Sequence, residues 1–246
     1  MVTVAAIVVA AGEGHRLGAG GPKAFVLLAG RALFLHSVER LAGIPGLLEQ
    51  VLVVPPGTAG RVQEEWGSEW RRLRVSRVVE GGKRRQDSVA AGFAAVSKKA
   101  EIVLIHDAAR PLVRTADAVR VVEAAERDGA ALLAVPLADT LKREGPAGRV
   151  AETLERRGLW QAQTPQGFRR GTYAAALERA MHLRIEVTDD AAMVERAGGT
   201  VTLVEGDPSN AKITTPADLA AAEALLAAEG AADRAAPPSA PKRRSR

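Results

Sequence analysis

Cysteine is absent from this sequence of 246 residues. A disulfide framework and a thiolate metal site are therefore both excluded, which fits a reducing compartment. No apolar run reaches the length that spans a membrane, and the apolar N-terminus lacks the basic segment with which a signal peptide begins. We therefore expect a cytoplasmic protein that makes no contact with a membrane.

An excess of basic residues is also missing from most of the chain, although the formal net charge is +5. Four of the 34 basic residues lie in Pro241–Arg246, which leaves 30 against 29 acidic residues. No aromatic residues separate the charges of this basic end, whereas nucleic-acid binding needs a basic patch on the folded domain. We therefore expect no nucleic-acid partner and interpret residues 229–246, rich in alanine, proline and arginine, as a disordered basic tail.

Strand-like and helix-like segments alternate along residues 1–228. This pattern is typical of α/β proteins, and it predicts a Rossmann-like, doubly wound and mostly parallel sheet. We expect residues 1–228 to form a single domain, since this length suits one large α/β unit. The expected strands cover residues 4–10, 49–54, 73–79, 102–105, 130–135 and 201–205, and the expected helices cover 33–42, 58–66, 86–96, 115–129, 170–181, a segment after Thr188 and a last segment capped by Thr215 before Pro216.

The alternation lapses between Pro136 and Trp160. This segment has a turn at residues 144–148, flanked by two polar and weakly patterned stretches. Loops of this length are uncommon in compact domains unless they have a function. We therefore predict a projecting β-hairpin arm over residues 136–160, with a disordered surface loop as the alternative.

The first expected strand, Val4–Ala10, is continuously apolar and leads directly into a glycine-rich basic loop. Such a run is typical of a parallel strand covered on both faces, and ligands bind beyond the carboxyl ends of such strands. Gly12 and Gly14 allow backbone amides to approach phosphate oxygens, and Arg16 and Lys23 can neutralise the phosphate charge. The loop therefore predicts a nucleotide triphosphate site, with an ordinary strand-to-helix turn as the alternative.

Two better-known phosphate-binding loops do not match this segment. The dinucleotide fingerprint requires glycine or alanine where this chain has Leu17, and a P-loop requires Gly-Lys-Ser/Thr where it has Pro22-Lys23-Ala24. The loop therefore belongs to neither of these two classes.

Further motifs follow the opening loop in a fixed order. They are Gly81-Gly82-Lys83-Arg84-Arg85-Gln86-Asp87-Ser88-Val89, His106-Asp107-Ala108-Ala109-Arg110-Pro111, Gly158-Leu159-Trp160, Thr164-Pro165-Gln166, Thr188-Asp189-Asp190 and Asn210-Ala211-Lys212-Ile213-Thr214. The set resembles the nucleotidyltransferase superfamily and, within it, the 2-C-methyl-D-erythritol 4-phosphate cytidylyltransferase family, from Val4 to about Leu226. This resemblance implies cytidylyl transfer from CTP to that sugar-alcohol phosphate. The nearest alternative is ribitol-5-phosphate cytidylyltransferase, which shares the loop and the cytosine motif.

The resemblance also implies roles for individual residues. Arg16, Lys23 and Lys212 would bind the triphosphate and stabilise charge that develops at the α-phosphate. Small or polar residues would contact the nucleotide, namely Ala10, Ala11, Gly12, Gly14, Gly81, Gly82, Ser88 and Ala108. Hydroxyl and guanidinium groups would bind the sugar-alcohol phosphate, namely those of Arg110, Thr140, Arg156, Thr164 and Thr188.

Asp107 ends an apolar strand, and a carboxylate among phosphates predicts a ligand for Mg²⁺. The alternatives are a helix cap or an ion-pair partner for Arg110. We expect His106 to be packed at the strand end rather than to bind a ligand, and Thr188 is equally well placed to cap the next helix. In the resembled family the arm reaches across a homodimer, so the resemblance also implies a homodimer through residues 136–160.

Overall fold

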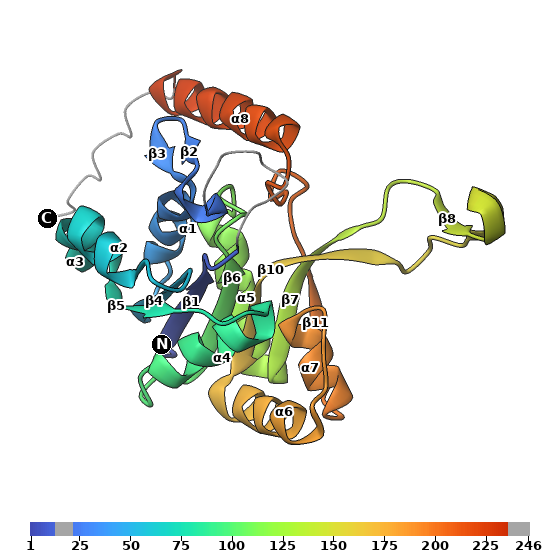
Figure 1. Ribbon diagram of the computed structural model, residues 1–246, viewed down its shortest axis with the longest axis horizontal. Helices are drawn as coiled ribbons and strands as arrows, with labels where there is room; N and C mark the ends of the chain where they lie inside the picture. Colours follow the sequence, from blue (N-terminus) through green and yellow to red (C-terminus); the bar gives the residue numbers. More distant parts are fainter. Residues whose placement is uncertain (13–21, 236–246) are drawn as a thin grey trace, which may run out of the picture.

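Seven strands form one sheet in the part of the chain that the structure, a computed structural model, describes: residues 1–12 and 22–235 (Figure 1). β10 runs antiparallel to both of its neighbours, and the other pairs are parallel. This confirms the predicted, mostly parallel α/β sheet. The strands lie in the order β11 (Thr202–Glu205), β7 (Ala130–Pro136), β10 (Trp160–Arg169), β6 (Ile102–Asp107), β1 (Val4–Val9), β4 (Leu47–Val54) and β5 (Val75–Glu80).

Helices cover both faces of this sheet (Figure 1). Side chains alternate between the two faces of a strand, so in β1 Val4 and Val8 join one buried core while Ala5 and Ile7 join the other. A strand covered on both faces has to be apolar throughout, which explains the apolar run at the start of the sequence. One face packs against α1 (Leu33–Ala42), α2 (Ala59–Trp66), α3 (Trp70–Leu73) and α5 (Thr115–Asp128), and the other against α4 (Arg85–Ala95), α6 (Arg170–Leu183) and α7 (Asp190–Arg196).

The last helix, α8 (Pro216–Ala235), lies outside these layers, near a short hairpin of β2 (Leu27–Leu28) and β3 (Arg31–Ala32). Its predicted cap is confirmed, because the Thr215 hydroxyl accepts a hydrogen bond from the Asp218 amide at 3.2 Å. The helix continues to residue 235, so the predicted tail boundary at residue 228 is wrong. Residues 236–246 lie outside the described part. Although α8 has 20 residues, no described helix is long and apolar enough to cross a membrane.

Residues 137–159 leave the sheet as a two-stranded arm (Figure 1). Its strands β8 (Leu141–Glu144) and β9 (Val150–Leu154) pair antiparallel on either side of a turn at Pro146–Gly148. At the base of the arm, the Leu137 amide donates to the Leu159 carbonyl at 3.0 Å. The structure therefore has the predicted projecting hairpin rather than an unstructured loop.

The central strand β10 is not predicted by the sequence. It contains Pro165, and proline is rare in a central strand because it has no amide hydrogen to donate. The pairing of β10 with β7 is interrupted between Ala162 and Gln166, so Pro165 lies where no ladder hydrogen bond is required. Gly167 then permits close packing, since a Cβ there would lie 2.8 Å from Cγ1 of Val121 in α5.

The packing of α4 on the sheet yields a test of this fold. A Cβ on Gly92 would lie 2.6 Å from Cγ2 of Ile7 and 2.8 Å from Cγ2 of Val53, both fully buried. Gly92→Ala is therefore expected to lower the free energy of unfolding by about 1–3 kcal/mol through overpacking, measured by urea denaturation. The control is Gly60→Ala in α2, where no atom lies within 4 Å and alanine should stabilise by about 0.5–1 kcal/mol. A Gly92→Ala protein as stable as the wild type would contradict the packing.

Candidate active site

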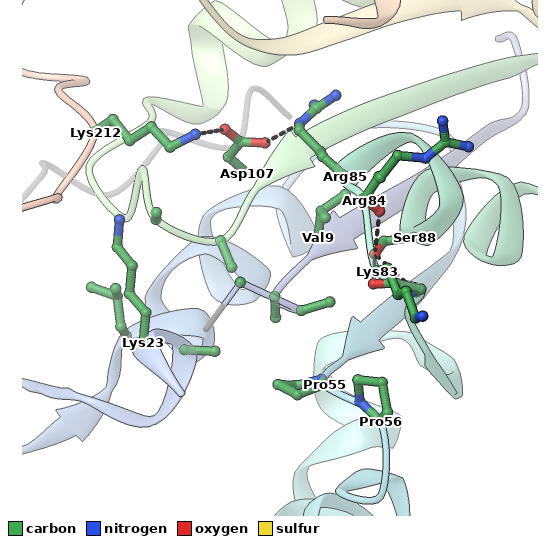
Figure 2. A pocket seen from close by; sticks show the side chains of 18 of the residues that line it. Val9, Lys23, Pro55, Pro56, Lys83, Arg84, Arg85, Ser88, Asp107 and Lys212 are labelled. Carbon is green, nitrogen blue, oxygen red and sulfur yellow. Dashed lines mark hydrogen bonds and ion pairs between the residues drawn. The ribbon is translucent and has the colours of Figure 1, made fainter. Parts of the chain in front are cut away.

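A pocket of about 720 Å³ opens at the carboxyl ends of β1, β4 and β6 (Figure 2). Open α/β sheets bind their ligands at this edge. Gly14 and Arg16, two of the predicted site residues, lie outside the described part of the chain. The predicted residues that line the pocket are Ala10, Ala11, Gly12, Lys23, Gly82, Ser88, Asp107, Ala108 and Lys212.

Two glycines let the loop after β5 approach the start of α4 closely. A Cβ on Gly81 would lie 2.6 Å from both the Ala11 Cβ and the Ser88 hydroxyl oxygen, and one on Gly82 would lie 2.5 Å from the Asp87 Cβ. The Ser88 hydroxyl accepts a hydrogen bond from the Gly82 amide at 3.1 Å. The result is a narrow wall of backbone groups and one hydroxyl.

The carboxylate of Asp107 lies between two cations (Figure 2). Its Oδ2 accepts a hydrogen bond from the Lys212 ammonium at 2.7 Å, and its Oδ1 accepts one from Arg85 Nε at 3.1 Å. Burial alone would raise the pKa of Asp107, but the neighbouring charges of Arg85 and Lys212 hold it well below its usual range. Asp107 is therefore ionised, and the structure pairs it with these two cations rather than with Arg110.

Arg85 is a site residue that the sequence prediction missed. It lines the pocket and also donates from Nη1 to Asp190 Oδ2 at 2.7 Å, and the Tyr173 hydroxyl donates to Asp190 Oδ1 at 2.8 Å. Burial raises the pKa of Asp190, against the opposing effects of Arg85 and Tyr173. The signal available was the position of Arg85 and Asp190 inside two quoted motifs. Their pairing across 105 residues leaves no trace in the sequence.

Thr164 and His106 hold the backbone of Asp107 through a chain of two hydrogen bonds. The Asp107 amide donates to the Thr164 hydroxyl at 3.0 Å, and that hydroxyl lies 3.0 Å from His106 Nδ1. Burial lowers the pKa of His106 to about 4, so the ring is neutral. Its Nε2 lies 3.1 Å from the Arg110 carbonyl and must donate to it, which leaves Nδ1 to accept from Thr164. His106 is thus packed at the strand end, as expected, and the Thr164 hydroxyl proton is already engaged.

The remaining predicted acceptor-binding residues do not line the pocket of their own chain. Arg110 is held in the body, donating to the Asn210 carbonyl at 2.8 Å, and its burial lowers its pKa. Thr140, just before β8, and Arg156, just after β9, are both exposed at the end of the arm strands nearer the sheet. Arg156 donates to the carbonyl of Ala138.

Thr188 is exposed just before α7. The alternative of Thr188 as the cap of that helix is wrong, because Asp189 caps it by accepting a hydrogen bond from the Ala192 amide at 2.9 Å. The start of α7 is therefore fixed by Asp189, the residue that follows Thr188.

The donor atoms near Asp107 fit a magnesium ion that is held mainly by a substrate. The described residues contain no group of three or more His, Cys, Asp or Glu side chains that could hold a metal. Mg²⁺ in phosphate-binding sites usually takes one or two carboxylates together with substrate phosphates and water. Asp107 supplies one ionised carboxylate on the pocket wall, and each of its oxygens, although it accepts one hydrogen bond from Lys212 or Arg85, keeps a further lone pair. A metal site made of protein ligands alone is not present in the described part.

Known proteins similar to this chain include enzymes of a single activity and bifunctional enzymes. A sequence model of the family described as IspD: 2-C-methyl-D-erythritol 4-phosphate cytidylyltransferase matches residues 4–228. The 2-C-methyl-D-erythritol 4-phosphate cytidylyltransferase of Syntrophus aciditrophicus (strain SB) is 42% identical over 226 residues, which are 92% of this chain and 97% of that protein. The bifunctional enzyme IspD/IspF of Anaeromyxobacter sp. (strain Fw109-5) is 46% identical over 92% of this chain, which spans 58% of that enzyme.

Two solved structures share the fold as well. The 2-C-methyl-D-erythritol 4-phosphate cytidylyltransferase of Thermus thermophilus superposes with a TM-score of 0.75 at 33% identity, covering 92% of this chain and 100% of the other. The 4-diphosphocytidyl-2C-methyl-D-erythritol synthase of Anaerococcus prevotii gives a TM-score of 0.78 at 26% identity, with 92% and 99% covered. On its motifs, fold, pocket and relatives, this chain belongs to the 2-C-methyl-D-erythritol 4-phosphate cytidylyltransferase family.

Proposed function

We propose that this chain transfers the cytidylyl group of CTP to 2-C-methyl-D-erythritol 4-phosphate. The products are 4-diphosphocytidyl-2-C-methyl-D-erythritol and pyrophosphate, in a step of non-mevalonate isoprenoid biosynthesis. The observation that carries the proposal is a glycine-walled pocket at the sheet edge, lined by Lys23 from the start of the chain and Lys212 from near its end. Relatives named for this enzyme, at 42% and 41% identity, support the choice of substrates.

The main task of this site is charge neutralisation, because both substrates are anions. An oxygen of the phosphate monoester forms a bond to the α-phosphorus of CTP while the bond from that phosphorus to pyrophosphate breaks. Cations fixed near the phosphorus lower the barrier because they need no reorientation as charge develops. Lys23 and Lys212 have this role in the proposal, together with Arg16, which resemblance assigns to the same phosphates.

The cytosine ring lies against the narrow wall formed by Gly81, Gly82 and Ser88. Backbone amides, carbonyls and the Ser88 hydroxyl can read the edge of a pyrimidine, and a small slot at this wall would exclude purines. Ala10, Ala11 and Gly12 lie against the ribose and phosphates, and Gly14 and Ala108 complete the nucleotide contacts. The small side chains are explained by the closeness of the nucleotide to the backbone.

Mg²⁺ is the proposed cofactor, with Asp107 as its protein ligand. When bound, the ion would neutralise charge on the triphosphate. The protein contributes an ionised carboxylate that Thr164 orients through the Asp107 amide. Arg85 and Lys212 balance the charge of this carboxylate.

The arm supports a homodimer as the active form. Thr140 and Arg156 lie on the projecting hairpin and do not line the pocket of their own chain. We infer that they bind the sugar-alcohol phosphate in the pocket of a second copy, where Arg156 pairs with the phosphate. Arg110, Thr164 and Thr188 contribute from the body of the chain, and Thr164 acts as an acceptor because its proton is engaged by His106.

Substrate specificity is tested by a direct comparison of acceptors. We expect higher kcat/KM with 2-C-methyl-D-erythritol 4-phosphate than with ribitol 5-phosphate, measured by pyrophosphate release with CTP as donor. Preference for ribitol 5-phosphate would contradict the assigned acceptor.

The cofactor is tested by removing the metal. Chelation by EDTA should abolish turnover, because the triphosphate charge is then no longer neutralised, and added Mg²⁺ should restore turnover. Turnover that survives complete chelation would contradict the assigned cofactor.

Action of the arm in trans is tested with mixed dimers. The Lys23→Ala and Arg156→Ala proteins should each be nearly inactive. For Lys23→Ala, kcat should fall roughly 10²- to 10³-fold, the scale for the loss of one preorganised charge. A dimer of one chain of each kind has one site with both residues intact, so random reassociation should recover about a quarter of the wild-type sites. Each variant refolded alone at the same total concentration is the control. If verified mixed dimers show only the sum of the separate activities, Arg156 does not act in trans.

A further inference from the structure

A row of hydrogen-bonded side chains extends from the pocket into the interior. Lys212 Nζ and Arg85 Nε donate to the two oxygens of Asp107, at 2.7 and 3.1 Å. Arg85 Nη1 donates to one oxygen of Asp190 at 2.7 Å, and the Tyr173 hydroxyl donates to the other at 2.8 Å. The four charges alternate in sign along this row, which we call the relay. Both oxygens of each carboxylate are therefore engaged.

The two ends of the relay lie in different surroundings. Lys212 lines the pocket with 41% of its side chain exposed, and Arg85 lines it with 28% exposed. Asp190 and Tyr173 do not line it, and their exposures are 1% and 0%. The relay therefore meets solvent on the side of the pocket and ends inside the protein.

Asp190 is fixed by three elements of the fold. It is the first residue of α7, Tyr173 reaches it from α6, and Gln166 of β10 accepts hydrogen bonds from the amides of Asp190 and Ala191 at 3.1 and 2.9 Å. A carboxylate held by its backbone and by both oxygens has little freedom to move. It is a rigid anchor for the guanidinium of Arg85.

We infer that Asp190 and Arg85 are positioning residues for the reaction: they fix the carboxylate of Asp107, which in turn holds the ammonium of Lys212 at the pocket. This rests on the proposed function, in which Lys212 acts on the phosphates of the substrates. Tyr173 completes the relay by fixing Asp190. The relay thus explains how a flexible lysine side chain on a segment without regular secondary structure is kept in one place.

Stability alone explains these buried charges poorly. Removing ions from water costs free energy, and a buried ion pair is often no more stabilising than packed apolar residues of the same volume. A cation placed in advance does lower the barrier, because no reorganisation is needed when charge develops. The burial of Asp190 is therefore explained by its effect on Lys212: it fixes Arg85 and, through Asp107, the position of the Lys212 ammonium at the pocket.

Tyr173→Phe is the mildest substitution that loosens the relay. The ring of Tyr173 packs on Phe93 and Phe168 with centroid distances of 5.1 and 5.0 Å, and phenylalanine keeps both contacts. The matched control is Leu177→Ala, because buried Leu177 lies one turn further along α6 and takes no part in the relay. The control reports the effect of loosening that helix without removing the hydroxyl.

A double-mutant cycle on kcat measures the coupling of Tyr173 to Lys212. Tyr173→Phe is expected to lower kcat about three- to tenfold, the scale of one hydrogen bond, with KM for CTP changed less than about twofold. Lys212→Ala alone should cost about 10²- to 10³-fold. In the Lys212→Ala background, Tyr173→Phe should change kcat by less than about twofold, because the group it positions is gone. Leu177→Ala should lower Tm and leave kcat unchanged.

Two kinetic results would overturn the inference. One is a wild-type kcat for Tyr173→Phe. The other is a loss of equal size in the wild-type and Lys212→Ala backgrounds, which would mean that the relay acts through another group, such as Arg85 on the substrate itself. Failure of the proposed function is distinguishable, since it would appear as absence of turnover in the wild type.

Tyr173 also offers a readout that does not depend on turnover, because it is the only tyrosine in the chain. Tyrosine labelled with carbon-13 at Cζ therefore gives a single resonance. Saturating CTP should shift this resonance in the wild type, since phosphates bound beside Lys212 change the field on its ammonium and this change reaches Asp190 and Tyr173 through Asp107 and Arg85. CTP should leave the resonance unchanged in Lys212→Ala. Absence of a shift in the wild type, or an equal shift in Lys212→Ala, contradicts the inference.

Discussion

The ion pair between Asp107 and Lys212 joins two distant parts of the chain at the pocket. Asp107 ends β6 beside the first strand, whereas Lys212 follows β11 and is 105 residues further along. The pair forms because the sheet brings both segments to one edge, and it persists because Arg85 and the hydroxyl of Thr164 hold Asp107 from other sides. A neutral Asp107 would deprive Lys212 of its carboxylate partner and leave Arg85 paired with Asp190 alone. The two cations keep this buried carboxyl group ionised by lowering its pKa, and the ionised carboxylate in turn holds both cations at the pocket.

Positive charge dominates the described wall of the pocket. Asp107 is the only acidic residue among the described lining residues, and it is already paired. A surplus of cations in a cleft attracts polyanions and raises the rate at which they associate. A triphosphate therefore suits this surface. The basic residues that line the pocket are Lys23, Lys83, Arg84, Arg85 and Lys212.

Local patterns predicted the elements that local forces determine. Helix α1 has the predicted bounds, Leu33–Ala42, because its apolar residues recur at helical spacing and pack on the sheet. Strand β10 escaped prediction because its place between β6 and β7 comes from pairing partners far away in sequence, and Pro165 argued against it. The extension of α8 to residue 235 was missed because low complexity suggested disorder, although alanine has the highest helix propensity.

Site residues were predictable where a motif assigns a chemistry to a residue type. Among the described residues, Ala10, Ala11, Gly12 and Lys23 of the loop line the pocket, as does Lys212 of the Asn210–Thr214 segment. Arg85 and Asp190, by contrast, had no local signature. Their roles depend on a contact between the start of α4 and the start of α7 that only the folded chain creates. The sequence also does not tell which of two adjacent residues of similar capping ability caps a helix, as with Thr188 and Asp189 before α7.

The base of the arm has a consequence for how this protein can vary. Trp160 pairs with Pro136, so the two segments of the arm leave and re-enter the sheet side by side at a fixed register. Residues added or removed at the tip, around Pro146–Gly148, do not alter that register, because the pairing of β7 with β10 is set on the sheet side. The length of the hairpin can thus change while the sheet edge at which Asp107 lies stays the same.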